Sequence, residues 1–154
     1  MNNPNHYLCV DPGGSTGWAT FNEIALPTGR GIERGVENFA KWMNELDPPP
    51  VLIIYEDFRL FGHKAIAQVG SKMEASQAIG IIKAAATRWN SAMIAQQPQA
   101  HKLGAMYSGK KPGAHANSHD IVAYNHGIYY LTQHGLIDSR LSKRKLVNPA
   151  NKRT

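Results

Sequence analysis

An unbroken apolar run at residues 51–55, Val-Leu-Ile-Ile-Tyr, constrains the fold more than any other part of the sequence, and the acidic residue Glu56 follows it directly. The run predicts a strand, and because it shows no polar alternation, both faces of that strand should be covered. Such a strand lies at the centre of a sheet. A carboxylate at the end of a buried strand needs a partner, since an unpaired buried charge is costly. Glu56 is therefore a candidate functional residue.

Strand and helix signals alternate along the rest of the chain. A polar, glycine-containing stretch follows the central strand at 58–70, and residues 104–113 are interpreted as a mobile basic loop. The expected strands lie at 6–13, 17–21, 31–35, 51–55 and 91–95, and the expected helices begin at Val36, near Ala75 and at Asn117 or Ser118. This order predicts an α/β protein with a mixed sheet and helices on both faces.

The size and composition of the chain favour a single globular domain without a membrane span. It has 154 residues, of which 42% are hydrophobic, enough for one core. Its longest apolar run is far shorter than the roughly 20 residues of a membrane helix, and its first residues lack the layout of a signal peptide. Cys9 is the only cysteine, so no internal disulfide forms. We therefore expect a reduced, cytoplasmic protein.

The positive charge of the chain is concentrated at its C-terminal end. The formal net charge is +6, and residues 139–154 contain six basic residues and no acidic one. Residues 1–138 are therefore neutral overall, and we interpret them as the folded domain and 139–154 as a flexible basic tail. A neutral body with a cationic tail predicts a polyanionic partner, most naturally nucleic acid. The alternative is a solvated tail that only aids solubility.

Three acidic residues stand at positions suited to a catalytic site. Asp11 follows the first strand and opens the motif Asp-Pro-Gly-Gly-Ser-Thr-Gly, Glu56 ends the central strand, and Asp120 lies in the first turn of the last helix. If the first and central strands are parallel neighbours, their ends meet at one edge of the sheet. Clustered carboxylates repel unless a cation neutralises them, and their oxygens suit Mg²⁺ or Mn²⁺. Two such ions support phosphodiester hydrolysis.

Each of these residues also has a purely structural interpretation. Asp11 before Pro-Gly can shape a turn, and Asp120 can interact with the helix dipole. The glycine-rich stretch 13–17 can cradle a phosphate through its backbone N–H groups, but it lacks the Gly-Lys-Ser/Thr ending of a P-loop.

The histidines near the last helix offer a competing metal site. His115, His119 and His126 have helical spacing that can suit zinc. A helix cap at Asn117 or Ser118 would separate the first two, and the chain has no further cysteine ligands, so zinc is disfavoured. His119, beside Asp120, is better interpreted as an auxiliary metal ligand or proton carrier, or simply as a helix-cap residue.

Taken together and in this order, these motifs resemble those of the RuvC-like Holliday-junction resolvases of the ribonuclease H-like superfamily, particularly compact phage versions. Cys-Val-Asp-Pro-Gly-Gly-Ser-Thr-Gly-Trp-Ala resembles the first-strand motif, with Asp11 as its acid, and Ile-Ile-Tyr-Glu-Asp-Phe resembles the second, with Glu56. The helix from Ala75, the strand exit at 97–102 and the helix from His119 to His126 also resemble the family. The resemblance spans roughly residues 6–135.

The resemblance implies a ribonuclease H-like mixed five-stranded sheet with helices on both faces, with residues 1–138 as the nuclease domain. It implies a metal-dependent endonuclease that resolves four-way and other branched DNA junctions by symmetric phosphodiester hydrolysis. Family members are homodimers, because a junction needs two symmetric cuts. Asp11, Glu56 and Asp120 would hold Mg²⁺, with Mn²⁺ as a substitute, and His119 would assist catalysis.

The resemblance also suggests which residues contact DNA. Lys102 would steady the phosphate backbone, and either Phe58 or Phe61 would stack on an unpaired base, although ordinary core packing is slightly favoured for Phe58. The candidate nucleic-acid contacts are Lys102, Lys110, Lys111, Arg59, Phe61, Lys64 and Lys72.

The sequence departs from the family at the last helix. The family has two acids three residues apart there, the second directly before an alanine. Aligning Ala123 with that alanine places Val122 in the fourth-acid position and His119 in the third. Either Asp120 takes over as ligand with His119 assisting, or the site binds one metal weakly.

Three other functions are compatible with parts of the sequence. The chain can be a branched-DNA-binding protein of the same fold with weak or lost cleavage, since Val122 removes a ligand. An actin-like or sugar-kinase-like ATPase has a similar phosphate loop but needs two lobes. A purely electrostatic DNA binder would depend on the tail alone.

Overall fold

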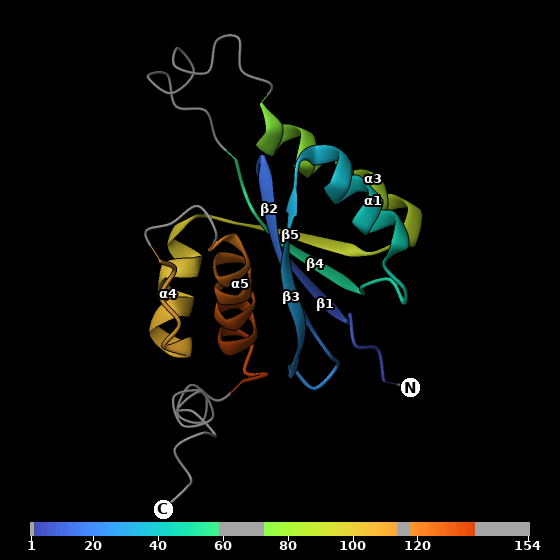
Figure 1. The fold of residues 1–154 in the computed structure, drawn as a ribbon. Helices are drawn as coiled ribbons and strands as arrows, with labels where there is room; N and C mark the ends of the chain where they lie inside the picture. Colours follow the sequence, from blue (N-terminus) through green and yellow to red (C-terminus); the bar gives the residue numbers. More distant parts are fainter. Residues whose placement is uncertain (1, 59–72, 114–117, 138–154) are drawn as a thin grey trace, which may run out of the picture.

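The computed structural model describes residues 2–58, 73–113 and 118–137. Its centre is one five-stranded sheet with the order β3-β2-β1-β4-β5 (Figure 1). The first three strands pair antiparallel, and β1 pairs with β4, and β4 with β5, in parallel. The strands are β1 (Tyr7–Asp11), β2 (Ser15–Phe21), β3 (Pro27–Arg34), β4 (Leu52–Glu56) and β5 (Ala92–Gln96). The predicted mixed sheet is therefore confirmed.

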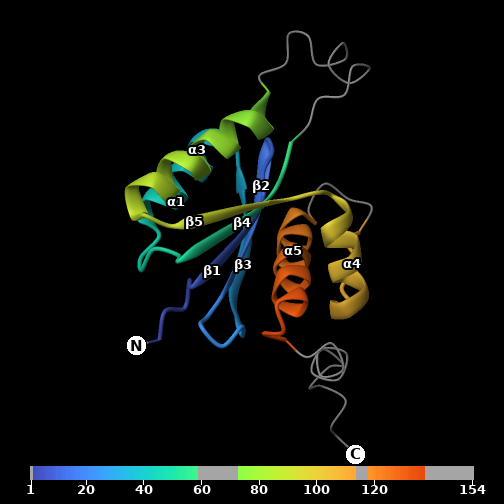
Figure 2. The ribbon, with the colours of Figure 1, turned by 180° about the vertical axis from the view of Figure 1, so that it is seen from behind.

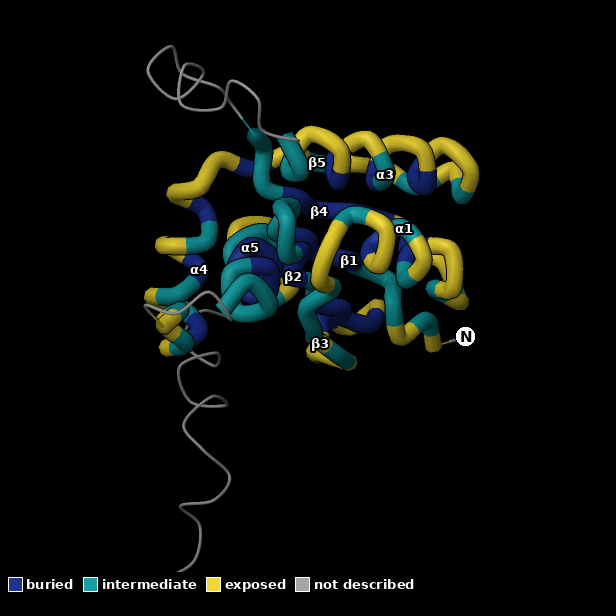
Figure 3. The backbone as a smooth tube through the Cα atoms, turned by 45° about the horizontal axis from the view of Figure 1, so that its top comes forward, coloured by how far each residue is buried: buried dark blue, intermediate teal, exposed yellow. Residues whose placement is uncertain are grey.

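Helices cover both faces of the sheet, as predicted. One face packs against α1 (Val36–Glu45) and α3 (Glu74–Trp89), and the other against α5 (His119–Gln133), which in turn packs against α4 (Gln99–Ser108) (Figures 1 and 2). The outer sides of α1, α3 and α4 are exposed, whereas the sides facing inward are buried (Figure 3). The result is a three-layer α/β arrangement with α4 outside the third layer.

The central strands contribute to two cores, one on each face. Leu8, Val10 and Ile53 pack with α1 and α3, while Cys9 and Ile54 pack with α5. Alternate residues of a strand point to opposite faces, so in a strand that is buried on both faces every position faces a core and favours an apolar residue. This explains the unbroken apolar run and confirms the predicted central position of β4.

The predicted loop at 104–113 is wrong in its first half, because α4 extends to Ser108. Gly104 suggested a loop, but in the structure it is a packing position. A Cβ at Gly104 would lie 1.9 Å from the backbone oxygen of Asn125 in α5. The glycine therefore allows two helices to approach closely, and irregular backbone begins only at Gly109.

Other element boundaries differ by a few residues. The first strand stops at Asp11 rather than continuing to residue 13, and β3 begins at Pro27, earlier than predicted. Gly29 and Gly31 weaken the local strand signal of β3, which is formed by its pairing along the whole of β2. The last helix follows Ser118, one of its two predicted starts.

Within the described ranges, no helix is long and apolar enough to cross a membrane.

Several predictions concern parts of the chain outside the described residues. The residues named in the sequence analysis that lie outside those ranges are Arg59, Phe61, Lys64, Lys72, His115, Asn117 and the tail at 139–154.

Candidate active site

The first two predicted acids lie at the ends of neighbouring parallel strands. β1 and β4 pair in register up to Val10 and Tyr55, and the next residue of each strand is Asp11 or Glu56. The side chains of Asp11 and Glu56 are 13% and 22% exposed, so both reach solvent from a largely buried setting. Carboxyl ends of parallel strands are where α/β proteins bind ligands. The predicted parallel pairing of the first and central strands is confirmed, and it puts Asp11 and Glu56 at the same edge of the sheet.

The start of α5 lies directly against the end of β1. Gly17 pairs with Asp11 across the β1–β2 hairpin, and a Cβ at Gly17 would lie 2.0 Å from the backbone oxygen of His119. Only a residue without a side chain leaves room for the helix there. The last glycine of the Gly-rich motif thus has a packing role that its sequence context did not reveal.

His119 interacts with Asp11 through this close approach. Its Nδ1 lies 2.8 Å from Oδ2 of Asp11. This hydrogen bond raises the pKa of His119 above its ordinary value, burial opposes the rise, and the nearby carboxylates add to it. The His119 side chain is 38% exposed. The contact with Asp11 therefore shifts the ring of His119 toward its protonated form, and the assisting role of His119 stays a prediction.

Glu56 is held by a second histidine, whose contact the sequence did not predict. Nε2 of His126 lies 2.8 Å from Oε2 of Glu56, and Nδ1 of the same ring lies 2.7 Å from Oε1 of Gln96. The His126 side chain is completely buried. Its separation of seven residues from His119, two helical turns, places both on one face of α5. That spacing was the available signal, but it was interpreted only as a zinc pattern.

Asp120 faces a basic residue of the outer strand. Its Oδ2 lies 3.2 Å from Nε of Arg30 on β3. The Arg30 guanidinium also lies 6.0 Å from the ring centre of Tyr124, and Nζ of Lys110 lies 5.7 Å from the same ring. In the described part of the chain, no three His, Cys, Asp or Glu side chains are grouped so as to hold a metal. Joint ligation by Asp11, Glu56 and Asp120 stays a prediction.

Of the predicted DNA-contacting lysines, the three that the structure describes lie on and after α4. Lys102 is exposed near the start of α4, and Lys111 is exposed after its end. Lys110 is fixed through its backbone, since its N–H donates to Ser108 Oγ and its carbonyl accepts from Asn125 Nδ2. Phe58 packs against the α1–α3 core, which agrees with the core-packing interpretation.

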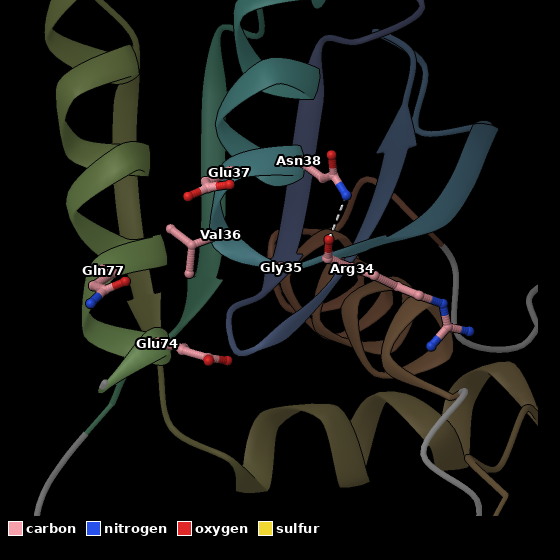
Figure 4. A pocket seen from close by; sticks show the side chains of 7 residues that line it. All are labelled: Arg34, Gly35, Val36, Glu37, Asn38, Glu74 and Gln77. Atoms are coloured by element: carbon pink, nitrogen blue, oxygen red, sulfur yellow. Dashed lines mark hydrogen bonds between the residues drawn. The ribbon is translucent and has the colours of Figure 1, made fainter. Parts of the chain in front are cut away.

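A hollow of about 280 Å³ lies between the starts of α1 and α3 (Figure 4). The described residues around it include none of the predicted site residues. Two carboxylates, Glu37 and Glu74, border it, and Asn38 donates to the Arg34 carbonyl at its rim. Arg34 also lines it, so its lining carries two acids and one base. This excess of negative charge does not suit a DNA phosphate, and the hollow is not assigned to the candidate site.

No family model and no curated protein matches the sequence. Solved structures do match the fold. Thermus thermophilus RuvC in complex with a Holliday junction substrate is 14% identical with a TM-score of 0.61, and the match covers 88% of this chain and 97% of that one. A second structure of Thermus thermophilus RuvC is also 14% identical, with a TM-score of 0.58 and coverage of 88% and 98%. Neither structure supports the phage part of the resemblance. The chain has a RuvC-like, ribonuclease H-like fold.

Proposed function

We propose that this protein is a metal-dependent endonuclease that cuts branched DNA, with the four-way junction as its main substrate. The observation that most supports the proposal is the pair Asp11 and Glu56, adjacent at the carboxyl ends of parallel strands and both partly exposed. The RuvC-like fold supports a junction-resolving nuclease in particular.

The carboxylate pair suits a hard divalent cation. The histidine contacts use one oxygen of each carboxylate, which leaves the second oxygen of each outside those bonds. Partly exposed carboxylate oxygens are the donors that Mg²⁺ and Mn²⁺ prefer. Asp11 and Glu56 would therefore hold the ion, with Asp120 as the further predicted ligand. The bound ion would supply charge neutralisation and activation of a water.

The protein's own residues prepare this site for a phosphate. Beside an ionised Asp11, Nδ1 of His119 is the donor, and this contact raises the pKa of the ring, which shifts it toward its positively charged form at the edge of the site. Lys102, Lys110 and Lys111 add cations on and after α4 that can neutralise backbone phosphates. Arg59, Phe61, Lys64 and Lys72 stay predicted contacts from the segment between β4 and α3.

Two symmetric cuts require two sites, so the proposal includes a homodimer that faces one junction. A cytoplasmic location, where DNA is processed, also belongs to the proposal, as does assistance from the basic tail at 139–154. The neutral body and cationic tail would make binding depend steeply on salt.

The deciding experiment is a nicking assay on a synthetic four-way junction, with and without Mg²⁺ or Mn²⁺. Wild-type protein should cut only with metal, and Asp11→Asn and Glu56→Gln should each abolish cutting while junction binding persists. Glu45→Gln is the matched control, because Glu45 is an exposed acid of α1 away from the strand ends. Unchanged cleavage by both site variants would show that the site is assigned wrongly.

A second candidate is a protein of the same fold that binds branched DNA without efficient cleavage. Two observations favour it: Val122 occupies the predicted fourth-acid position, and Asp120 is paired with Arg30. The same assay separates the two functions. Selective junction binding without metal-dependent cutting by the wild-type chain would support the binding protein.

A further inference from the structure

We propose that His126, supported by Gln96, is a positioning residue that fixes the carboxylate of Glu56; the proposal rests on the function proposed above. The His126 ring is completely buried, yet it contacts a carboxylate that is 22% exposed in the candidate site. It therefore connects the core of the molecule to the edge where chemistry is expected.

The proton positions follow from the two partners of the ring. An ionised carboxylate only accepts hydrogen bonds, so Nε2 of His126 has to be the donor toward Oε2 of Glu56. The Gln96 amide can interact with Nδ1 in two orientations. Its oxygen accepts from a protonated Nδ1, or, in the flipped orientation, its NH₂ group donates to an unprotonated Nδ1. In both arrangements the proton facing Glu56 is on Nε2.

Three elements hold this chain of hydrogen bonds in place. Glu56 and Gln96 are paired residues at the ends of the parallel neighbours β4 and β5, and His126 reaches them from α5. Gln96 is buried, and its backbone oxygen accepts from the N–H of Asp57. Neither partner of the His126 ring is therefore free to move independently of the sheet.

The position of α5 is itself fixed next to His126. Asn125 is fully buried; its Oδ1 accepts from Ser108 Oγ at 2.6 Å and its Nδ2 donates to the Lys110 carbonyl at 2.8 Å. These bonds fasten α5 to α4 one residue before His126. An imidazole held this firmly restricts the Glu56 side chain to one rotamer, which an isolated glutamate at a strand end would not keep.

The two histidines of α5 therefore act from opposite sides. His119 contacts Asp11 from the solvent side, with 38% exposure, whereas His126 contacts Glu56 from the core. A buried histidine with a purely structural role would need only hydrogen-bond partners within the core. His126 instead donates its Nε2–H to Glu56, the candidate metal ligand. Replacing His126 should therefore change metal binding in a protein that remains folded.

The test compares His126→Leu, which removes the donor, with His126→Gln, whose amide N–H can replace it. His134→Leu is the control, because His134 is exposed just beyond the end of the same helix. Mn²⁺ binding to the full-length protein is measured by electron paramagnetic resonance, and kcat and KM by junction nicking. His126→Leu should weaken Mn²⁺ binding about 10–100-fold and lower kcat with KM for the junction unchanged. His126→Gln should recover most of both.

The outcomes separate the two proposals. If His126→Leu melts cooperatively and binds Mn²⁺ like wild type, the positioning role is refuted. If the wild-type chain neither binds Mn²⁺ nor cuts, the proposed function fails, and the carboxyl ¹³C resonance of Glu56 in labelled protein still decides the contact. That resonance should shift in His126→Leu and not in His134→Leu; no shift overturns the inference. Should His126→Leu fail to fold, Gln96→Leu, which removes the support of the ring, should still weaken Mn²⁺ binding and shift the Glu56 carboxyl resonance, by less than loss of the donor would. Wild-type values for both in Gln96→Leu would refute the proposal.

Discussion

Replacing Gly17 by alanine should damage both the stability and the activity of this protein, although it adds only one methyl group. The new Cβ would lie 2.0 Å from the oxygen and 2.1 Å from the carbon of the His119 carbonyl. Real Cβ atoms do not approach other atoms closer than 3.0 Å, so α5 must withdraw from β2 by about 1 Å. The obstacle is backbone rather than a flexible side chain, and it cannot rotate away.

The cost can be bounded from the structure. Inserting a methyl group into a close-packed site costs about 1–3 kcal/mol. Gly17 lies within a regular strand and is not among the glycines with positive φ, so alanine has no torsional penalty to add. Because a chain of this size loses about 2–4 °C in Tm per kcal/mol, Tm should fall by about 2–12 °C.

Gly80→Ala is the matched control for this substitution. Gly80 is exposed within α3, and a Cβ there would have open space. Alanine is preferred over glycine in a helix by about 1 kcal/mol, so Gly80→Ala should stabilise the protein. The midpoint of urea denaturation should therefore fall in Gly17→Ala and rise in Gly80→Ala, each relative to wild type.

Gly17→Ala should also lower the activity of the protein that remains folded. A withdrawal of about 1 Å breaks the 2.8 Å contact between His119 and Asp11, and a misplacement of that size at a catalytic group costs about 100-fold in rate. Junction nicking should be measured well below the Tm of the variant. A Gly17→Ala protein as stable and as active as wild type would refute the close approach of α5 to β2.

Three further measurements test other parts of the molecule. The raised pKa of His119 means that its hydrogen bond to Asp11 stabilises the fold fully below the ordinary histidine pKa of about 6.5 and loses this effect as pH rises through the folded-state pKa. Because the ring is partly exposed, the free energy of unfolding of wild type relative to His119→Gln, measured by urea denaturation, should fall by under about 1 kcal/mol between pH 5.5 and 8.5. A difference that grows with pH would contradict this sign. Cys9 is fully buried and burial raises the pKa of its thiol, so it should react with an aromatic disulfide reagent only after unfolding; rapid reaction of the native protein would contradict its position in the core. Deleting residues after Asp138 removes six basic residues and should reduce the slope of log affinity against log salt by up to about 5, with junction preference over duplex DNA retained; loss of all binding would favour the purely electrostatic binder.

The edge of the sheet that carries Asp11 and Glu56 was predictable because it follows from chain order and strand type. The unbroken run before Glu56 identifies a central strand, and Asp11 ends the other strand rich in buried apolar residues. Parallel pairing of two such strands puts both acids at one edge. This inference uses only periodicity and topology, which local sequence specifies well.

The contacts of the last helix were not predictable in the same way. Whether Asp120 turns toward Asp11 or toward Arg30 depends on how α5 is rotated against β3, and β3 itself has a weak signal because of its glycines. The role of His126 depends on Gln96, 30 residues away, being at the end of the neighbouring strand. Side-chain pairing across three elements leaves no periodic pattern in the sequence.

Close backbone packing explains why one helix can supply so much of this site. His119, Asp120 and His126 all come from α5, so their positions relative to Asp11 and Glu56 depend on how accurately α5 is seated. Gly17 on β2 and Gly104 on α4 let the backbone of α5 approach from two directions, where any Cβ would collide with main-chain atoms. A clash with backbone atoms is harder to relieve than a clash with a side chain, because no change of rotamer can move the backbone away. The same glycine that suggested a phosphate-binding loop is thus better explained as the residue that sets the distance between α5 and the carboxylates.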